Sequence, residues 1–251
     1  MKIIRNIMMI ALLCAFTFSV TAKPSKQQEK LNTCLKLDQG GSVNPNNTVF
    51  LIDFHNVFAF TDWGAAWNSL WYNPGKFSKI FRIAKYYAQK PFHTKSVQGF
   101  SLLQYLNAGY EDTTYQAANL LLVNSFKMDT PAVTLLKKIK EDGYKLILFS
   151  NTPETSIEWQ VRAHPEVFNL FDAKWYRRIA NNNITKKHAE SFEQVKVLSQ
   201  ETLGHQPEHY IFIDDTKGNI TRAARADICG ILFTSVNQTD EILTNLGILT
   251  K

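Results

Sequence analysis

The sequence predicts an α/β protein built on a doubly wound, Rossmann-like parallel sheet, and three observations lead to this fold class. Four short apolar runs have the pattern of buried strands. Helical patterns separate these runs, as expected when parallel strands are joined by crossover helices. Three of the runs end at Asp53, Ser150 and Asp214. Ligands of such sheets bind beyond the carboxyl ends of the strands, so these three residues mark a candidate site.

The expected elements follow in chain order. The apolar runs predict strands at 49–54, 145–150, 209–214 and 230–235, with a weaker candidate at 171–177. The helical patterns cover 131–142, 191–203 and 216–226. In the first of them, Val133, Leu135, Leu136 and Ile139 form the apolar face, and Gly143 is a typical stop. Strand and helix therefore alternate through the second half of the chain.

Residues 58–129 interrupt this alternation with a long insertion that is rich in aromatic residues. We expect several helices and no strand here, because so long a connection must have structure of its own. The predicted division is a leader at 1–22, a core domain at 23–57 and 130–251, and a helical cap at 58–129. The aromatic residues of the cap either form a small core or contact substrate. They include Trp63, Trp67, Trp71, Tyr72, Phe77, Phe81, Tyr86 and Tyr87.

The first 22 residues have the pattern of a secretory signal peptide. Lys2 and Arg5 give a basic start, an apolar run covers 7–20, and Val20-Thr21-Ala22 offers the small residues of a cleavage site. We expect a secreted or periplasmic protein without stable membrane association after cleavage. The alternative is an uncleaved membrane anchor. After cleavage Cys34 and Cys229 remain, either as a disulfide or as two thiols.

Composition limits the partners. The 251 residues suit one domain with a sizeable insertion. The formal charge is +6, and removal of Lys2 and Arg5 leaves +4. This small surplus favours anionic ligands. No run of Lys and Arg with interleaved aromatic residues is present, so we expect no nucleic-acid partner.

Four sequence blocks, taken together, resemble the haloacid dehalogenase (HAD) superfamily, most of whose members are phosphatases. A strand ending in Asp is VFLIDFHNVF, and a strand ending in Ser is KLILFSN. A lysine before a helix is ITKKHAESF, and a strand ending in acids is IFIDDTKGNI. The blocks occur in the order of that family, and the match runs from about residue 49 to 235. The insertion after the first block is similar to the helical cap of one subtype.

The resemblance implies that Asp53 is a nucleophile that attacks phosphorus and forms an aspartyl-phosphate. It implies that Asp214 and Asp215, together with Asp53, hold Mg²⁺, a hard cation that prefers carboxylate oxygens. Such a cation lets two anions approach each other. The alternative for Asp53 is a strand-end helix cap. The alternative for Asp214 and Asp215 is an N-terminal helix cap beside a solvated acid.

The resemblance also assigns contacts to the phosphoryl group. Ser150 and the backbone amide of Asn151 would donate hydrogen bonds to a phosphate oxygen. A lysine of the third block would steady the nucleophile and the phosphoryl group. Lys186 and Lys187 are both candidates, and the spacing to Phe192 favours Lys186. Ser150 could instead be a plain turn residue.

His55 departs from the family pattern, which has a second Asp at this position. That residue supplies a backbone carbonyl to the metal, and any side chain preserves this role. Its carboxyl group also protonates the leaving group and then activates water, and this acid–base role is what His55 puts in question. Imidazole can titrate near neutral pH, but a nearby divalent cation disfavours its charged form. His55 therefore either serves as a base toward water or has only a structural role.

The sequence thus predicts Mg²⁺-dependent hydrolysis of a phosphomonoester, with a small phosphorylated molecule as substrate. One alternative is a non-catalytic binding protein on the same scaffold. Another is a metal-independent haloacid dehalogenase, which the acid pair Asp214 and Asp215 disfavours. The substrate's identity and the oligomeric state are not encoded in these patterns.

Overall fold

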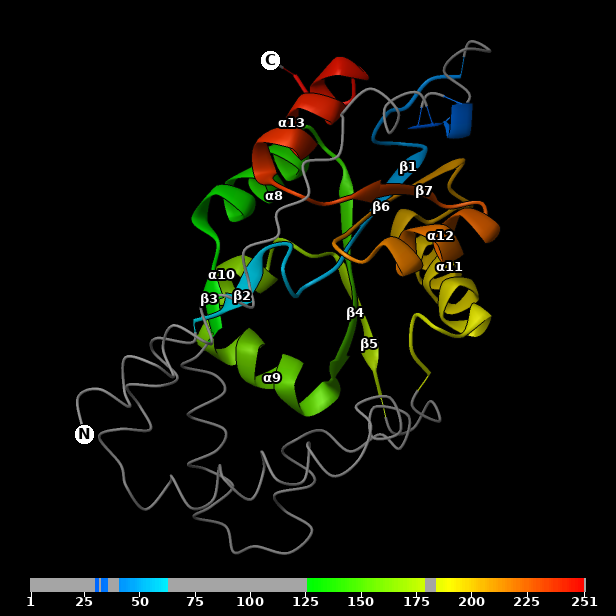
Figure 1. The fold of residues 1–251 in the computed structure, drawn as a ribbon. Coiled ribbons are helices and arrows are strands. Elements are labelled where there is room, and N and C mark those ends of the chain that lie inside the picture. The colour runs from blue at the N-terminus through cyan, green and yellow to red at the C-terminus, as the bar shows by residue number, and fades with distance from the viewer. Residues whose placement is uncertain (1–29, 32, 36–40, 63–125, 179–183, 251) are drawn as a thin grey trace, which may run out of the picture.

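A computed structural model of the chain describes residues 30–31, 33–35, 41–62, 126–178 and 184–250 (Figure 1). The predicted leader at 1–22 lies outside the described residues. So does most of the predicted cap at 58–129. Within the described segments, no helix is long and apolar enough to cross a membrane.

The core is a five-stranded sheet in the order β5-β4-β1-β6-β7, and every neighbouring pair is parallel. The strands are β1 (Thr48–Ile52), β4 (Lys145–Pro153), β5 (Ala173–Arg177), β6 (His209–Asp214) and β7 (Cys229–Leu232). The predicted fold class is therefore confirmed, and the weaker strand candidate at 171–177 is β5. The central strand β1 has β4 on one side and β6 on the other. A sheet wound in both directions from its centre has its ligand crevice at this point.

Register places the ends of the central strands at one level. Ile52 of β1 pairs with Leu148 of β4 and with Ile213 of β6. Asp53 N donates a hydrogen bond to Ile213 O at 3.0 Å, so the β1–β6 pairing continues one residue past Ile52. Asp53 and Asp214 consequently lie side by side at the carboxyl end of the sheet.

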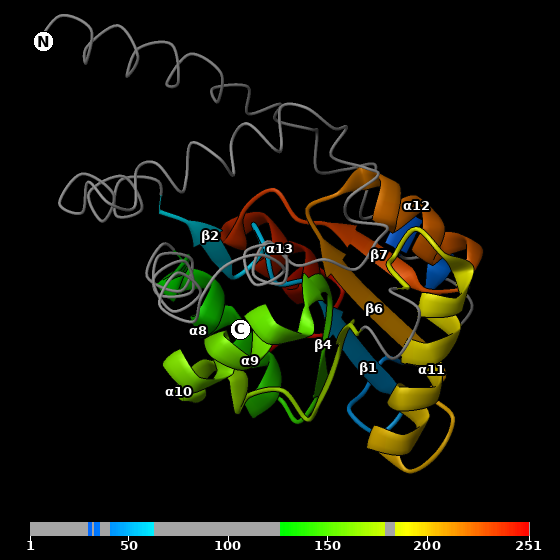
Figure 2. The same ribbon diagram turned by 90° about the horizontal axis from the view of Figure 1, so that it is seen from below.

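Helices cover both faces of the sheet, as Figures 1 and 2 show. One face carries α8 (Thr130–Glu141), α9 (Glu154–Ala163), α10 (Pro165–Phe168) and α13 (Val236–Asn245). The other carries α11 (Ala189–Leu203) and α12 (Lys217–Arg225). Strand β1 faces both layers, because Phe50 and Ile52 pack in the first core and Val49 and Leu51 in the second. Burial on both faces explains why the strand sequences are continuous apolar runs.

The expectation that 58–129 contains no strand is wrong at both ends. Strand β2 (Ala59–Thr61) pairs antiparallel with β3 (Phe126–Met128). Phe58 and Ala59 are fully buried in the core, and Asp129 N donates to Phe58 O at 2.9 Å. Each strand has three residues, too few to show an alternating pattern in the sequence. The described ends of the insertion are therefore fastened to the core by this ribbon.

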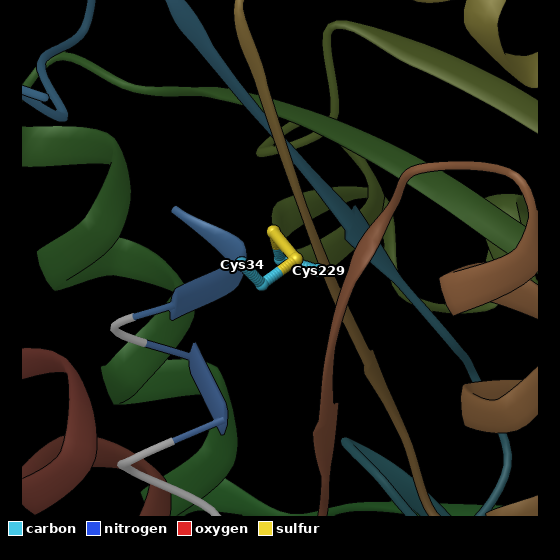
Figure 3. Close-up of a disulfide and its surroundings, with 2 residues drawn as sticks. All are labelled: Cys34 and Cys229. Carbon is cyan, nitrogen blue, oxygen red and sulfur yellow. A yellow bond between two sulfur atoms is a disulfide. The ribbon is translucent and has the colours of Figure 1, made fainter. Parts of the chain in front are cut away.

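A disulfide joins Cys34 to Cys229 and so decides between the two sequence alternatives for these cysteines (Figure 3). Cys229 is the first residue of β7, at the amino end of the sheet. Leu31 and Leu35, on either side of Cys34, are buried in the core. The segment around Cys34 is thus packed against the domain, although its polar surroundings in the sequence resemble a loose lead-in.

Candidate active site

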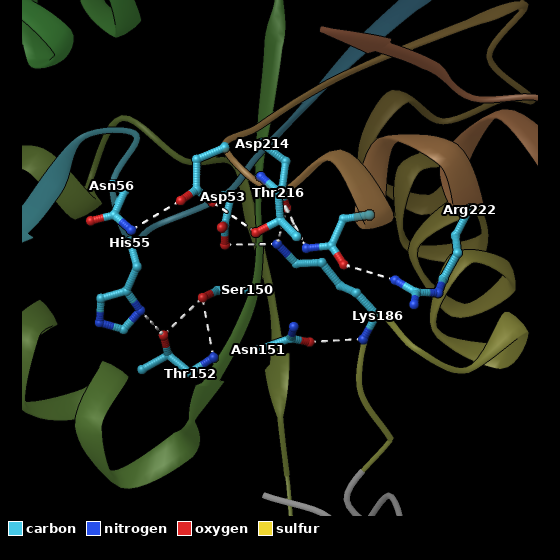
Figure 4. Close-up of polar contacts among 12 residues, drawn as sticks. Asp53, His55, Asn56, Ser150, Asn151, Thr152, Lys186, Asp214, Thr216 and Arg222 are labelled. Carbon is cyan, nitrogen blue, oxygen red and sulfur yellow. Dashed lines mark hydrogen bonds and ion pairs between the residues drawn. The ribbon is translucent and has the colours of Figure 1, made fainter. Parts of the chain in front are cut away.

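The candidate active site lies beyond the carboxyl ends of β1, β4 and β6 (Figure 4). Asp53 follows β1, Ser150 lies in β4, and Asp214 ends β6, and all three are buried. The structure therefore brings together the three strand-end residues that the sequence singled out. A polar cluster this buried requires its charges to be paired and hydrogen-bonded.

Lys186 supplies the pairing charge. Its side chain is fully buried, and its Nζ lies 2.7 Å from Asp53 Oδ1 and 2.7 Å from Asp214 Oδ2. Nζ also lies 5.3 and 5.1 Å from the ring centroids of Phe149 and Phe212. The aromatic walls exclude water, which strengthens the interaction between the ammonium group and the two carboxylates. The structure places Lys186 in the site, whereas Lys187 is exposed.

Asn151 holds Lys186 through its side chain. Its Oδ1 accepts a hydrogen bond from Lys186 N at 2.7 Å, across a gap of 35 residues. The sequence resemblance assigned Asn151 a different contact, from its backbone amide to a phosphate oxygen. The side-chain bond adds a second role, because it fixes the loop that delivers the lysine.

Asp214 is saturated with donors. Its Oδ1 accepts from Thr216 N at 2.7 Å and from Asn219 Nδ2 at 3.1 Å. Its Oδ2 accepts from Lys186 Nζ at 2.7 Å and from Asn219 Nδ2 at 3.0 Å. Asn219 is buried in α12 and in turn accepts a hydrogen bond from Arg222 Nη1 at 3.3 Å. Asp214 is therefore rigidly oriented by the start of α12.

Asp215 is less buried than Asp214 and is held by different residues. Asn56 Nδ2 donates to its Oδ2 at 2.9 Å, and Thr216 Oγ1 donates to its Oδ1 at 3.1 Å. Asn56 has φ of 56°, in the left-handed region, which Asn tolerates better than most residues. This backbone turn directs the Asn56 side chain across to the fourth block.

The donor set fits a divalent cation. Asp53, Asp214 and Asp215 each offer a carboxylate oxygen, and these oxygens lie within 4.8 Å of one another. Burial raises the pKa of Asp53 to about 6; the Lys186 ammonium opposes this rise, and the Asp214 carboxylate adds to it. Three acids beside one buried lysine leave surplus negative charge, and Mg²⁺ takes such hard oxygen ligands. The chemistry of the residues present therefore suits the metal that the motifs predict.

The His55 side chain packs between aromatic rings and contacts Thr152. Its ring lies 4.8 Å from the Phe54 ring and 4.9 Å from the Phe126 ring, measured between centroids. Its Nδ1 lies 3.1 Å from Thr152 Oγ1, and Figure 4 shows the ring turned toward Thr152. Burial lowers the pKa of His55 to about 4, and the charge of Lys186 contributes. The imidazole is consequently neutral at pH 7.

Ser150 shares its hydroxyl with Thr152. The two oxygens lie 2.8 Å apart, and Thr152 N donates to Ser150 Oγ at 3.2 Å. Thr152 therefore contacts both Ser150 and His55, two residues that the sequence had placed in the site without a link between them.

Sequence reasoning missed four residues that hold this site: Asn56, Thr152, Thr216 and Asn219. All four belong to or directly follow the recognised blocks. Asn56 and Asn219 were detectable as polar residues within strand-end motifs. Thr152 had no signal, because a threonine after a strand is common in turns.

Comparison with known proteins supports the fold. Neither a protein-family model nor a curated protein matches the sequence. A predicted HAD-like hydrolase from Porphyromonas gingivalis is similar in structure, with a TM-score of 0.54, 19% identity, and coverage of 74% of this chain and 89% of that one. A HAD-family enzyme from Bacteroides thetaiotaomicron, in complex with magnesium and inorganic phosphate, is also similar in structure. Its TM-score is 0.51 at 19% identity, over 73% of this chain and 92% of that chain.

A third similar structure is a HAD hydrolase from Bacillus subtilis bound to magnesium. Its TM-score is 0.51 at 16% identity, over 80% of this chain and 99% of that chain. At these identities the likeness concerns the fold, which includes the parallel five-stranded sheet and its flanking helices. Three of the four sequence blocks fall at the carboxyl ends of β1, β4 and β6, and the remaining block leads into α11 and carries Lys186. The chain therefore has the fold of the haloacid dehalogenase family.

Proposed function

We propose that this protein is a Mg²⁺-dependent phosphohydrolase that cleaves a small phosphomonoester through an aspartyl-phosphate on Asp53. The single observation that carries the proposal is the position of Lys186 Nζ, 2.7 Å from both Asp53 and Asp214. Burying a lysine between two acids costs desolvation energy, so this arrangement adds little to the stability of the fold. A reaction that transfers a negative phosphoryl group gives this arrangement a use.

The residues divide the reaction as follows. An Asp53 carboxylate oxygen attacks phosphorus, the bond between phosphorus and the ester oxygen breaks, and the leaving group departs as an alkoxide or aryloxide that takes its proton from solvent. Ser150 and the Asn151 amide donate hydrogen bonds to the phosphoryl oxygens, and Lys186 balances the charge on Asp53. Water then attacks phosphorus, which releases inorganic phosphate and restores Asp53.

Mg²⁺, when bound, would neutralise charge on Asp53 and on the phosphoryl group. Asp53 and Asp215 are the carboxylates best placed to hold it, with the backbone carbonyl of His55. Asp214 already accepts from Thr216, Asn219 and Lys186, so we assign it mainly to orienting the lysine. This division of roles refines the sequence expectation that Asp214 and Asp215 both hold the metal.

A second candidate is a binding protein that retains the phosphate site without turnover. His55 favours it, because the acid–base carboxyl of the family is missing and the imidazole is engaged with Thr152. The phosphohydrolase has more support, because a non-catalytic site has no need for the Asp53–Lys186 contact.

Turnover of two substrate types tests the proposal. Position 55 carries no carboxylic acid, so leaving groups that need no proton, such as aryl or acyl phosphates, should react faster than alkyl phosphates. General-acid assistance is worth ~10²–10⁴-fold, so the difference should be large. His55→Asp should narrow it by raising alkyl phosphate turnover. The proposal fails if the wild-type protein never exceeds Asp53→Asn on any phosphate ester, and the binding protein then takes its place.

Melting in the presence of Mg²⁺ tests the metal site separately. A cation that binds the folded state raises the melting temperature by mass action. Asp215→Asn should remove most of this shift, and the double variant with Asp214→Asn should remove it entirely. An unchanged shift in the double variant would place the cation elsewhere.

We also propose that the protein acts outside the cytoplasm, as a secreted or periplasmic enzyme without a nucleic-acid partner. The leader pattern at 1–22 supports this, and so does the Cys34–Cys229 disulfide, which suits an oxidising compartment. N-terminal sequencing of protein from its native host should begin near Lys23. A retained Met1 in a membrane fraction would indicate an anchor instead.

A further inference from the structure

We propose that Thr152 is a positioning residue that links His55 to Ser150, so that His55 controls the direction of the Ser150 hydroxyl. The inference rests on the proposed phosphohydrolase function and adds a role for the imidazole at position 55. Here His55 acts through Thr152 and does not itself exchange a proton with the leaving group.

The geometry is a continuous chain of three polar groups. His55 Nδ1 lies 3.1 Å from Thr152 Oγ1, which lies 2.8 Å from Ser150 Oγ. Ser150 and Thr152 lie two residues apart in β4, where the pairing with β5 shifts register, and their hydroxyl groups meet there. Both side chains are buried, Ser150 at 1% exposure and Thr152 at 5%. Buried hydroxyl groups depend on each other for hydrogen bonds, so the direction of one determines that of the next.

Counting protons leaves two arrangements that use every bond. In the first, His55 Nδ1–H donates to Thr152 Oγ1, and the Thr152 hydroxyl donates to Ser150 Oγ. Ser150 Oγ also accepts from Thr152 N at 3.2 Å, so both of its lone pairs are used. Its own hydrogen is then free to point into the site.

In the second arrangement the two side-chain bonds are reversed, and Thr152 N still donates to Ser150 Oγ. The Ser150 hydroxyl donates to Thr152 Oγ1, and the Thr152 hydroxyl donates to a bare His55 Nδ1. Ser150 then presents only a lone pair to the site. A phosphoryl oxygen is an acceptor with negative charge, so it pairs with the first arrangement and is repelled by the second. Phosphate binding therefore selects the tautomer of His55 with its proton on Nδ1.

Two matched pairs of variants test this link. Thr152→Val keeps the shape and removes the hydroxyl, whereas Thr152→Ser keeps the hydroxyl. Asn and Gln at position 55 test which imidazole nitrogen is needed, because their amide nitrogens lie at different numbers of bonds from Cα. The Asn amide nitrogen is three bonds from Cα, as Nδ1 is, and the Gln amide nitrogen is four, as Nε2 is. His55→Asn can donate to Thr152, and His55→Gln places its amide where Nε2 lies.

Loss of one hydrogen bond to a charged group is worth about a tenfold change. We expect Thr152→Val to weaken both aryl phosphate turnover and inhibition by inorganic phosphate by about tenfold, and Thr152→Ser to recover most of each. His55→Asn should be more active than His55→Gln. A higher activity of His55→Gln would overturn the inference, because the imidazole would then act through Nε2. The position 55 pair decides the question even where Thr152→Val does not fold.

Nitrogen NMR of the His55 ring gives a readout that does not depend on activity. Adding inorganic phosphate with Mg²⁺ to the wild-type protein should shift the ring toward the tautomer protonated on Nδ1, and Thr152→Val should lack this response. An unchanged tautomer in the wild-type protein, under conditions where phosphate inhibits, would overturn the link alone. Wild-type turnover no higher than that of Asp53→Asn would overturn the proposed function as well. Aryl phosphate turnover above that blank with equal activity in all four variants would overturn only the link.

Discussion

The two ends of the same parallel sheet are built on opposite principles. At the carboxyl end, Asp53, Asp214 and Asp215 gather around one buried lysine, Lys186. At the amino end, the polar groups around Asn47 are hydrogen-bonded to one another. Asn47 accepts from Asn44 N at 3.0 Å and from Thr48 Oγ1 at 2.7 Å. Its Nδ2 donates to Ser42 O at 2.8 Å and to Glu208 Oε2 at 3.1 Å.

Stability and activity therefore depend on opposite ends of the sheet. The amino end adds the Cys34–Cys229 disulfide and Asp172, whose Oδ2 accepts from Leu146 N at 3.0 Å at the start of β4. Its bonds are satisfied within the protein. The carboxyl end carries excess negative charge, which suits a cation. We therefore expect substitutions at the carboxyl end to change activity and those at the amino end to change stability.

Asp53→Asn should have the largest effect on activity, and it should not weaken the fold. Removing a nucleophile typically lowers turnover by about 10⁴-fold or more. The metal-free protein should not lose stability, because burial raises the pKa of Asp53 to about 6. Its ionised form is thus disfavoured in the fold, and this cost appears as pH rises from about 4 to 6 and is full above. At pH 8 the metal-free variant should therefore be more stable than the wild-type protein, which denaturant unfolding can measure.

The contrary result for Asp53→Asn would be a clear loss of stability at pH 8 in the absence of metal. It would mean that the Asp53–Lys186 pair holds the fold together and that the comparison between the two ends is wrong. Repeating the unfolding at pH 4 provides the internal control. The gain should shrink there, because Asp53 is then largely protonated in the folded protein.

Removing the disulfide should have the next largest effect, on stability alone. Cys34→Ser with Cys229→Ser frees a link that spans 195 residues of sequence. Losing a native disulfide typically costs about 2–5 kcal/mol. Turnover of the remaining folded protein should be unchanged, because Cys229 starts β7 at the opposite end of the sheet. The control is a reducing agent, which should destabilise the wild-type protein and leave the double serine variant unaffected.

The positions of the sheet strands along the chain were the most predictable part of this fold. The runs at 145–150 and 209–214 begin at the residues where β4 and β6 begin, because central parallel strands are apolar on both faces. β2 and β3 escaped prediction because each has three residues and its partner lies on the far side of the insertion. The Cys34–Cys229 pairing was undecided because nothing local to either residue specifies the other.

The site was predictable in its residue types but not in its connections. Asp53, Ser150 and Asp214 lie at or near the carboxyl ends of β1, β4 and β6, so their convergence follows from a parallel sheet. The hydrogen bonds between the blocks could not be predicted in this way. Asn56 reaches Asp215 across 159 residues, and Thr152 reaches His55 across 97. Such contacts are products of the fold, and a sequence shows them only after the elements have been placed in three dimensions.

Asp172→Asn should have the smallest effect, and its pH dependence sharpens the comparison. Burial would raise the pKa of Asp172, but hydrogen bonds from Lys140, Leu146 N and Lys145 outweigh it and lower the pKa below its usual value. An acid with a lowered pKa stabilises the fold above its unfolded pKa and loses this contribution as pH falls through the folded pKa. The variant should therefore be less stable near neutral pH by roughly 0.5–1 kcal/mol, and equal to wild type at low pH.

The matched control for this pH series is Asp240→Asn, which breaks the pair between Asp240 Oδ1 and Lys138 Nζ at 2.9 Å. Asp240 is far more exposed than Asp172, with 42% against 16% side-chain exposure, and it pairs with a single lysine. Its loss should change stability less, since exposed ion pairs contribute little. Chemical denaturation of both variants from neutral pH to below pH 4 makes the test. If Asp172→Asn shows no larger pH-dependent loss than Asp240→Asn, the amino end owes its stability to the disulfide and neutral hydrogen bonds, and its charges add nothing.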